Sequence, residues 1–137
     1  MSRKIVAIGG GENGREGYSY ETKEIDEEIV KLTNLEKPNF LFIGFASGRF
    51  EESYFNVMNK IYSNLGCNTD ILKLSDLNNI LKVKEKIEKA NIIYVGGGNT
   101  LKLMTLIRKY NIDSLLKNIV DKGTVLCGVS AGRNMLV

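Results

Sequence analysis

The chain has 137 residues, of which 43% are hydrophobic and 26% charged, and its formal net charge is +3. These values are typical of a globular domain and exclude a disordered chain. Lysines and glutamates alternate between residues 82 and 89, which indicates a solvated helix face and not a nucleic-acid-binding stripe.

Targeting and membrane signals are missing from the sequence. No apolar run approaches the roughly 20 residues that cross a bilayer, and residues 1–4 do not lead into a signal-peptide core. The two cysteines, Cys67 and Cys127, fit reduced thiols better than a disulfide framework. We therefore expect a cytoplasmic protein in which Cys127 packs in the core.

Apolar runs alternate with amphipathic charged segments from one end of the chain to the other. This rhythm predicts one α/β domain over residues 1–137, with a parallel sheet flanked by helices on both faces. In the first half of the chain, we expect a strand at 5–8, a glycine-rich loop at 9–17, a helix at 21–32, a strand at 40–43 and a helix at 51–65. In the second half, we expect a strand at 69–74, a helix at 77–89 and a strand at 92–95. Two helices at 101–110 and 112–120, which separate near Asn111, and a strand at 124–127 complete the prediction.

Two of these helices also predict which side chains are buried. Helix 51–65 carries Tyr54, Phe55 and Tyr62 on one side, where they are expected to join the core. Three acids of helix 21–32, at residues 26–28, are expected on a solvated face.

A G-x-S-x-G motif, Gly128-Val129-Ser130-Ala131-Gly132, stands directly behind the last predicted strand. A strand that runs into such a motif forms a nucleophile elbow, in which small neighbours let the serine hydroxyl project from a strained turn. Ser130 is therefore a candidate nucleophile. A serine needs a base, usually histidine, to take its proton, and the sequence contains no histidine.

A second motif, Gly96-Gly97-Gly98-Asn99-Thr100, follows the strand at 92–95 and opens a helix. Three glycines let the backbone turn sharply and aim bare N–H groups at an oxyanion or a phosphate. A plain strand-to-helix turn, capped by Asn99 or Thr100, explains the motif equally well. Because ligands of open parallel sheets collect at the carboxyl ends of strands, the two motifs can share one site.

The chain resembles the peptidase E and cyanophycinase family of serine peptidases, which has a flavodoxin-like, class I glutamine amidotransferase-like fold. The resemblance rests on residues 94–100 and 127–132, and more weakly on residues 8–12 and 42–47. It implies hydrolysis of short peptides through an acyl-enzyme on Ser130, without a cofactor.

The resemblance also assigns roles around the nucleophile. The N–H groups of Gly98 and Ala131 would form the oxyanion hole. Asn99, together with Gly97 and Thr100, would line the substrate cleft.

Two departures from the family pattern stand out. The family's histidine and its acidic partner lie beyond the elbow, in a part that this sequence does not have, so we expect a C-terminally truncated and catalytically incomplete chain. Arg133 replaces a small residue directly beside the nucleophile. Truncation would also leave apolar surface around Val125, Val129 and residues 135–137 exposed, and a homodimer joined through the C-terminal region is expected.

Other functions have less support. Gly9, Gly11 and Gly14 match a dinucleotide-binding fingerprint, but no carboxylate ends the next strand to bind a ribose. A metal site is not expected, since neither histidines nor clustered cysteines are present. The alternative that stays open is a non-catalytic remnant that binds small anionic or peptide ligands through its glycine-rich loops.

Overall fold

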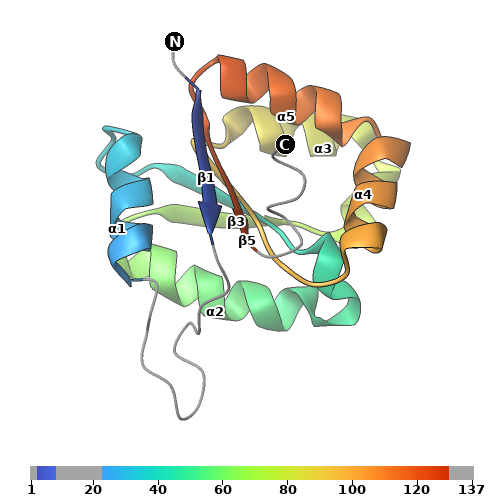
Figure 1. Ribbon diagram of the computed structural model, residues 1–137, viewed down its shortest axis with the longest axis horizontal. Coiled ribbons are helices and arrows are strands. Elements are labelled where there is room, and N and C mark those ends of the chain that lie inside the picture. Colours follow the sequence, from blue (N-terminus) through green and yellow to red (C-terminus); the bar gives the residue numbers. More distant parts are fainter. Residues whose placement is uncertain (1–2, 9–22, 130–137) are drawn as a thin grey trace.

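The structure, a computed structural model, describes residues 3–8 and 23–129 (Figure 1). The residues outside these ranges include the loop at 9–17, Ser130, Ala131, Arg133 and residues 135–137, for which exposure was predicted. The strands are β1 (Lys4–Ile8), β2 (Asn39–Ile43), β3 (Asn68–Leu72), β4 (Ile92–Val95) and β5 (Val125–Val129). The helices are α1 (Lys23–Leu32), α2 (Glu51–Asn64), α3 (Ile80–Lys89), α4 (Thr100–Lys109) and α5 (Ile112–Asp121), with the 3-10 segments η1 (Phe45–Phe50) and η2 (Leu74–Asn78).

The five strands form one parallel sheet in the order β1-β5-β4-β2-β3. Helices α1 and α2 cover one face of the sheet, and α3, α4 and α5 cover the other (Figure 1). The predicted α/β class is confirmed. Strand β4 lies between β5 and β2, so the loops that follow these three strands leave the same edge of the sheet.

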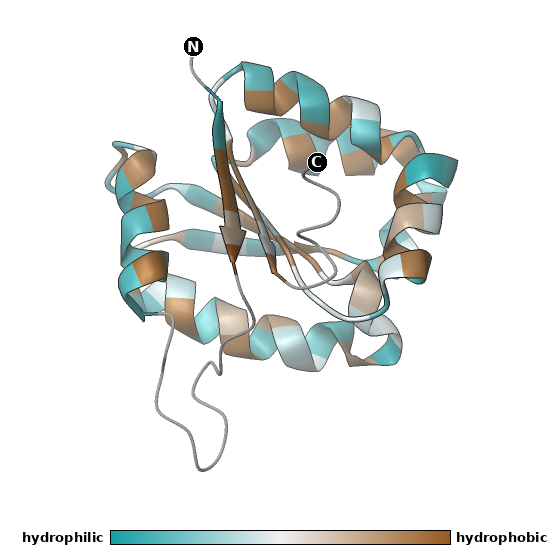
Figure 2. Ribbon diagram, in the orientation of Figure 1, coloured by the Kyte–Doolittle hydropathy of each residue, from teal (hydrophilic) through white to brown (hydrophobic). Residues whose placement is uncertain are grey.

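The burial of the strands follows from the two helix layers. All four residues of β4 and all five of β5 are buried, as expected for strands covered on both faces. Each helix turns its hydrophobic side toward the sheet (Figure 2). The core on the α2 side is aromatic, and there the Tyr62 ring stacks on Phe40 with ring centroids 4.0 Å apart. The predicted burial of Tyr62 is confirmed, and Tyr54 and Phe55 pack against this core.

Some predicted boundaries are wrong. Strand β5 continues through Gly128 and Val129, so the first two residues of the serine motif belong to the sheet. The expected strand 69–74 and helix 77–89 are shortened by η2, which lies between them. Asn79 begins α3 instead, because its side chain accepts a hydrogen bond from the Lys82 amide at 3.2 Å. The predicted separation of α4 from α5 is confirmed at Asn111, whose φ is 56°.

The predicted solvated face of α1 is wrong at Asp26. This carboxylate is completely buried and accepts a hydrogen bond from the Tyr62 hydroxyl on α2. The charge pattern of α1 does not reveal this partner, which lies 36 residues away. Glu28, two residues further along the same helix, is exposed as expected.

The last strand also differs from its predicted exposure. Val125 and Val129 are buried, so the expectation that they face water is wrong. Cys127 is buried between them, as predicted, and burial raises the pKa of its thiol above the ordinary value. Both cysteines are free thiols. Each helix in the described ranges is too short or too polar to cross a membrane.

Asp76 ties the β3–α3 connection together. Its carboxylate accepts the Lys73 amide at 2.9 Å and pairs with the ammonium groups of Lys82 at 2.9 Å and Lys86 at 3.4 Å. Burial raises the pKa of this carboxyl, but the hydrogen bond from Lys73 and the two lysines outweigh it, and the net shift is downward from 3.8. The ionised form therefore stabilises the fold.

We predict that Asp76→Asn lowers the free energy of unfolding by about 1–2 kcal/mol near neutral pH. A lowered folded-state pKa contributes stability that is fully present above the unfolded value and disappears as the pH falls through the folded value. The difference between wild type and variant should therefore shrink below about pH 4. Urea denaturation across pH 2–7 measures it. Asp121→Asn is the control, because its ion pair with Arg3 is exposed and contributes little; equal effects would contradict the prediction.

Candidate functional site

The site candidate lies where β4 and β5 end side by side. Val95 of β4 is paired with Gly128 of β5, so Gly96 leaves the sheet at the level of Val129. Ser130 follows Val129 directly in the chain, but it lies outside the described residues, as does Ala131. The structure thus brings the glycine loop, residues 96–99, to the sheet edge at which the serine motif begins.

Gly96 anchors the glycine loop to the neighbouring strand. Its N–H donates to the Ile43 carbonyl of β2 at 2.9 Å. A side chain is excluded at this position, because a Cβ would lie 2.9 Å from ring atoms of both Phe42 and Tyr54. The backbone therefore rests directly on two aromatic rings.

Gly97 faces α2. Its backbone lies near the Tyr54 side chain. Burial raises the pKa of the Tyr54 phenol, and the nearby Gly97 backbone opposes the shift without cancelling it. The phenol is therefore neutral at ordinary pH.

Gly98 holds a conformation that other residues rarely adopt. Its φ is 142°, and a Cβ built on it would lie 2.3 Å from the carbonyl oxygen of Ala46. Real Cβ atoms do not approach an oxygen so closely. Both the dihedral angle and the space therefore require glycine.

Asn99 ends the loop and begins α4. Its N–H donates to the same Ala46 carbonyl at 2.8 Å, and its side-chain oxygen accepts the Lys102 amide at 3.1 Å. Asn99 is thus the N-cap of α4, one of the two predicted caps, and Thr100 is the first helical residue. The two N–H groups of the Asn99 carboxamide remain potential donors.

The middle of the glycine loop keeps a backbone donor available. The amides of Gly96 and Asn99 are bonded to the carbonyls of Ile43 and Ala46. The Gly98 amide has no hydrogen-bond partner within the described residues, and Gly98 is exposed. An exposed N–H held in a fixed direction is the kind of group that stabilises an oxyanion.

The sequence did not predict the segment that supports this loop. Residues 45–50 form η1, which contacts α4 and supplies the Ala46 carbonyl. The Ser47 hydroxyl donates to the Gly44 carbonyl at 2.8 Å, so this serine has a structural partner. The Lys102 ammonium lies over Gly48, 2.9 Å from the position of a Cβ there. Gly44 and Gly48, which follow β2, are the feature of the sequence that could have indicated this segment.

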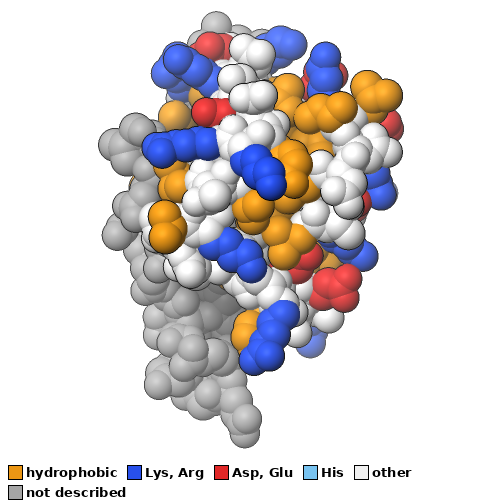
Figure 3. Space-filling model, turned by 90° about the vertical axis from the view of Figure 1, so that its right-hand side faces the viewer, with side chains coloured by type: hydrophobic (Ala, Val, Ile, Leu, Met, Phe, Trp, Pro, Cys, Tyr) orange, Lys and Arg blue, Asp and Glu red, His pale blue; other side chains and the backbone are white. Residues whose placement is uncertain are grey.

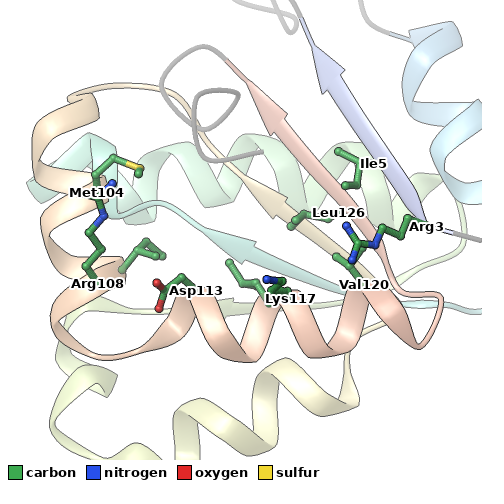
Figure 4. Close-up of a pocket in the computed structure, with 10 residues that line it drawn as sticks. Arg3, Ile5, Met104, Arg108, Asp113, Lys117, Val120 and Leu126 are labelled. Carbon is green, nitrogen blue, oxygen red and sulfur yellow. The ribbon is translucent and has the colours of Figure 1, made fainter. Parts of the chain in front are cut away.

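A separate groove of about 410 Å³ lies between β1, β5, α4 and α5 (Figure 4). Its described lining includes Arg3, Arg108, Lys117 and Asp113 around apolar residues, and none of these residues belongs to the glycine loop. On the face that carries α4, Lys and Arg side chains are dispersed among hydrophobic and polar groups (Figure 3). Within the described ranges, no group of three metal-ligating side chains comes together.

Comparison with known proteins gives a consistent result. The model of the family described as Peptidase family S51 matches residues 5–137. The chain is 31% identical over 137 residues to the uncharacterized peptidase YgaJ of Bacillus subtilis, an alignment that covers 95% of this chain and 54% of that protein. It is 26% identical over 136 residues to Peptidase E of Nostoc sp., covering 98% of this chain and 53% of that one.

A solved structure supports the same relationship. The crystal structure of a peptidase from an acI-B1 Actinobacterium matches with a TM-score of 0.75 at 26% identity, covering 95% of this chain and 55% of that chain. This similarity confirms the predicted flavodoxin-like α/β fold. The chain spans about half the length of the curated relatives it matches.

We predict that Gly98→Ala destabilises the protein by about 2–4 kcal/mol, because the new methyl group meets the Ala46 carbonyl. Urea denaturation of both proteins measures the effect. Gly66→Ala is the matched control: its φ of 93° is also positive, but a Cβ there lies 3.4 Å from its nearest atom. The control should cost only about 1 kcal/mol. Equal losses in the two variants would show that the Ala46 contact is unimportant.

Proposed function

The chain belongs to peptidase family S51, and on that premise we propose that it is a serine-type peptidase that cleaves short peptides through an acyl-enzyme on Ser130. The observation that carries the proposal is Gly98, which is exposed, has an amide without a partner in the described ranges, and lies in the loop that follows β4, the strand next to β5. Peptidase names among the relatives support the same reaction class.

In the proposed reaction, the Ser130 oxygen attacks the carbonyl carbon of the peptide bond. The carbonyl oxygen becomes an oxyanion, which accepts hydrogen bonds from the amides of Gly98 and Ala131. Collapse of this intermediate breaks the C–N bond, the amine leaves with the proton that the Ser130 hydroxyl gave up, and an acyl-serine ester remains. Water then hydrolyses the ester and regenerates the serine.

Substrate binding would use the remaining groups of the second motif. The Asn99 side-chain oxygen already accepts a hydrogen bond at the cap of α4, so the N–H groups of this side chain are the ones that can bind a substrate carbonyl. Thr100 and the Gly97 carbonyl would complete this wall of the cleft. We place the protein in the cytoplasm, where its buried free thiols stay reduced.

The proton acceptor for Ser130 is the part of the reaction that these residues do not supply. None of the 137 residues is a histidine. Serine hydrolases that lose a triad member keep only the residual rate given by the oxyanion hole and by binding. The 137-residue chain by itself is therefore proposed to be nearly inactive.

We predict that the 137-residue chain hydrolyses a panel of short peptides only at a residual rate, whereas prolonged incubation with a fluorophosphonate at alkaline pH labels Ser130. Mass spectrometry of the intact protein and its peptides measures the adduct. Ser130→Ala should abolish the label, and Ser47→Ala, which changes a hydrogen-bonded serine of η1, should retain it. A label on another residue would contradict the assignment of the nucleophile. Ordinary turnover that is lost in Ser130→Ala would reveal a base other than histidine.

We also propose that two copies associate through β1, because Val125 and Val129 of the C-terminal region are buried. Among the described strands, β1 stands at one end of the order and pairs with β5, and Ile5 on it is 41% exposed. An open strand edge favours pairing with a second copy.

We predict that light scattering at tens of micromolar gives twice the chain mass, and that Ile5→Lys gives a monomer, because a charged side chain on an edge strand opposes pairing. Lys4→Arg keeps the charge of β1 and should remain a dimer. A monomeric wild-type protein would refute the association.

A further inference from the structure

One face of strand β1 borders the groove between β1, β5, α4 and α5. Val6 and Ile8 point to the other face and pack in the core on the side of α1 and α2. Arg3, Ile5 and Ala7 alternate with them and are exposed. Among the described elements, no helix therefore covers the face of β1 that carries Ile5, and the groove of about 410 Å³ lies beside it.

The floor of the groove is apolar and fixed by the core. Ile107, Leu116, Val120 and Leu126 line it, and each is at most 6% exposed. Ile5 adds an apolar side chain that is 41% exposed. Because core packing holds the floor, the groove needs no rearrangement to accept a ligand, and its volume is in the range of small-molecule sites.

The charged side chains around the groove are mostly cations. Arg3, Arg108 and Lys117 line it together with a single carboxylate, Asp113. In the described part of the chain, neither Arg108 nor Lys117 forms an ion pair, whereas Arg3 pairs with Asp121 at 2.8 Å. The groove is therefore complementary to a negative charge.

The cations and the apolar side chains are arranged along the length of the groove. Figure 4 shows Arg3 and Lys117 toward the Val120 side, with Met104 and Asp113 toward the opposite side. Helix α5 advances about 10 Å between Asp113 and Val120. The carboxylate of Asp113 disfavours an anion on its own side, so the negative group of a ligand belongs beside Lys117, with an apolar chain extending away from it.

We propose that this groove binds an elongated organic anion, with its carboxylate at Lys117 and Arg3 and its aliphatic chain along Ile5 and Leu126 toward Met104. Lys117 is the main contact of the carboxylate, because Arg3 already pairs with an aspartate. The inference goes beyond the proposed function and does not involve the glycine loop or Ser130. Association through the backbone edge of β1 would leave this side-chain face in place.

The test uses decanoate as the probe and the 137-residue chain as the protein. Isothermal titration calorimetry measures the dissociation constant, and methyl NMR shows which side chains respond. Decanol has the same chain without the charge, and hexanoate has the charge with a shorter chain. Lys117→Gln removes the main cation. Lys122→Gln is the matched control, because Lys122 is an exposed lysine that directly follows α5 and does not line the groove.

We expect decanoate to bind with a Kd of about 0.1–1 mM. Hexanoate should bind at least about 10-fold more weakly, since each buried methylene contributes about fourfold. Decanol binding to the wild type and decanoate binding to Lys117→Gln should both be weaker by roughly three- to fivefold. Lys122→Gln should not differ from the wild type. The methyl signals of Ile5, Val120 and Leu126 should shift together.

Several results would overturn the inference: no saturation by decanoate up to about 10 mM, equal binding of decanol, equal effects of the two lysine substitutions, or methyl shifts outside the groove. Methyl shifts on dilution of the protein, without decanoate binding, would identify a second copy as the occupant and would also overturn it. Ser130→Ala should bind decanoate like the wild type, so failure of the proposed peptidase reaction and failure of this inference are separately visible.

Discussion

One oxygen atom, the carbonyl of Ala46, determines the shape of the site. It lies where a side chain of Gly98 would be, 2.3 Å from the Cβ position, and it accepts the Asn99 amide at 2.8 Å. The first contact forces glycine and a positive φ at residue 98. The second starts α4 at Thr100. Together they leave Gly98 exposed, with an amide that has no partner of its own in the described part of the chain.

The parallel sheet makes that contact possible. In the sequence, β3 and α3 separate β2 from β4, yet the two strands are neighbours in the sheet, with Ile43 paired to Val95. Their following loops must therefore meet at one edge. Strand β5 joins on the other side of β4, which brings the end of the serine motif's strand to the same edge. The arrangement is the one in which open α/β sheets form ligand sites.

Local patterns in the sequence predicted the features that depend on local physics. The apolar run at 92–95 became a strand covered on both faces, and Asn99 became a helix cap, because burial on a sheet and capping use neighbours in the sequence. The aromatic side of α2 was predictable from its helical spacing for the same reason. Ser130 and Ala131 lie outside the described residues, so their predicted roles stay predictions.

Features that depend on distant partners were missed. Asp26 is charged on a helix of charged residues, and only Tyr62 across the α1–α2 contact explains its burial. Segment η1 has no periodic pattern, and its conformation follows from the loop after β4, some fifty residues later in the chain. The end of β3 is set by Asp76, which draws in the Lys73 amide and two lysines of α3. In each case the sequence shows the residue but does not show which distant residue it contacts in the fold.

The oxyanion donor and the base place different requirements on the sequence. A backbone donor needs no particular side chain, only a rigid conformation, and here residues 42–54 provide that rigidity. The base must be a titratable group beside Ser130, and these 137 residues contain no histidine. Because a preorganised oxyanion hole accelerates acyl transfer even when triad members are absent, the first half of the chemistry can be examined without the second. The packing of this fold thus fixes the conformation of the glycine loop without any contribution from the base.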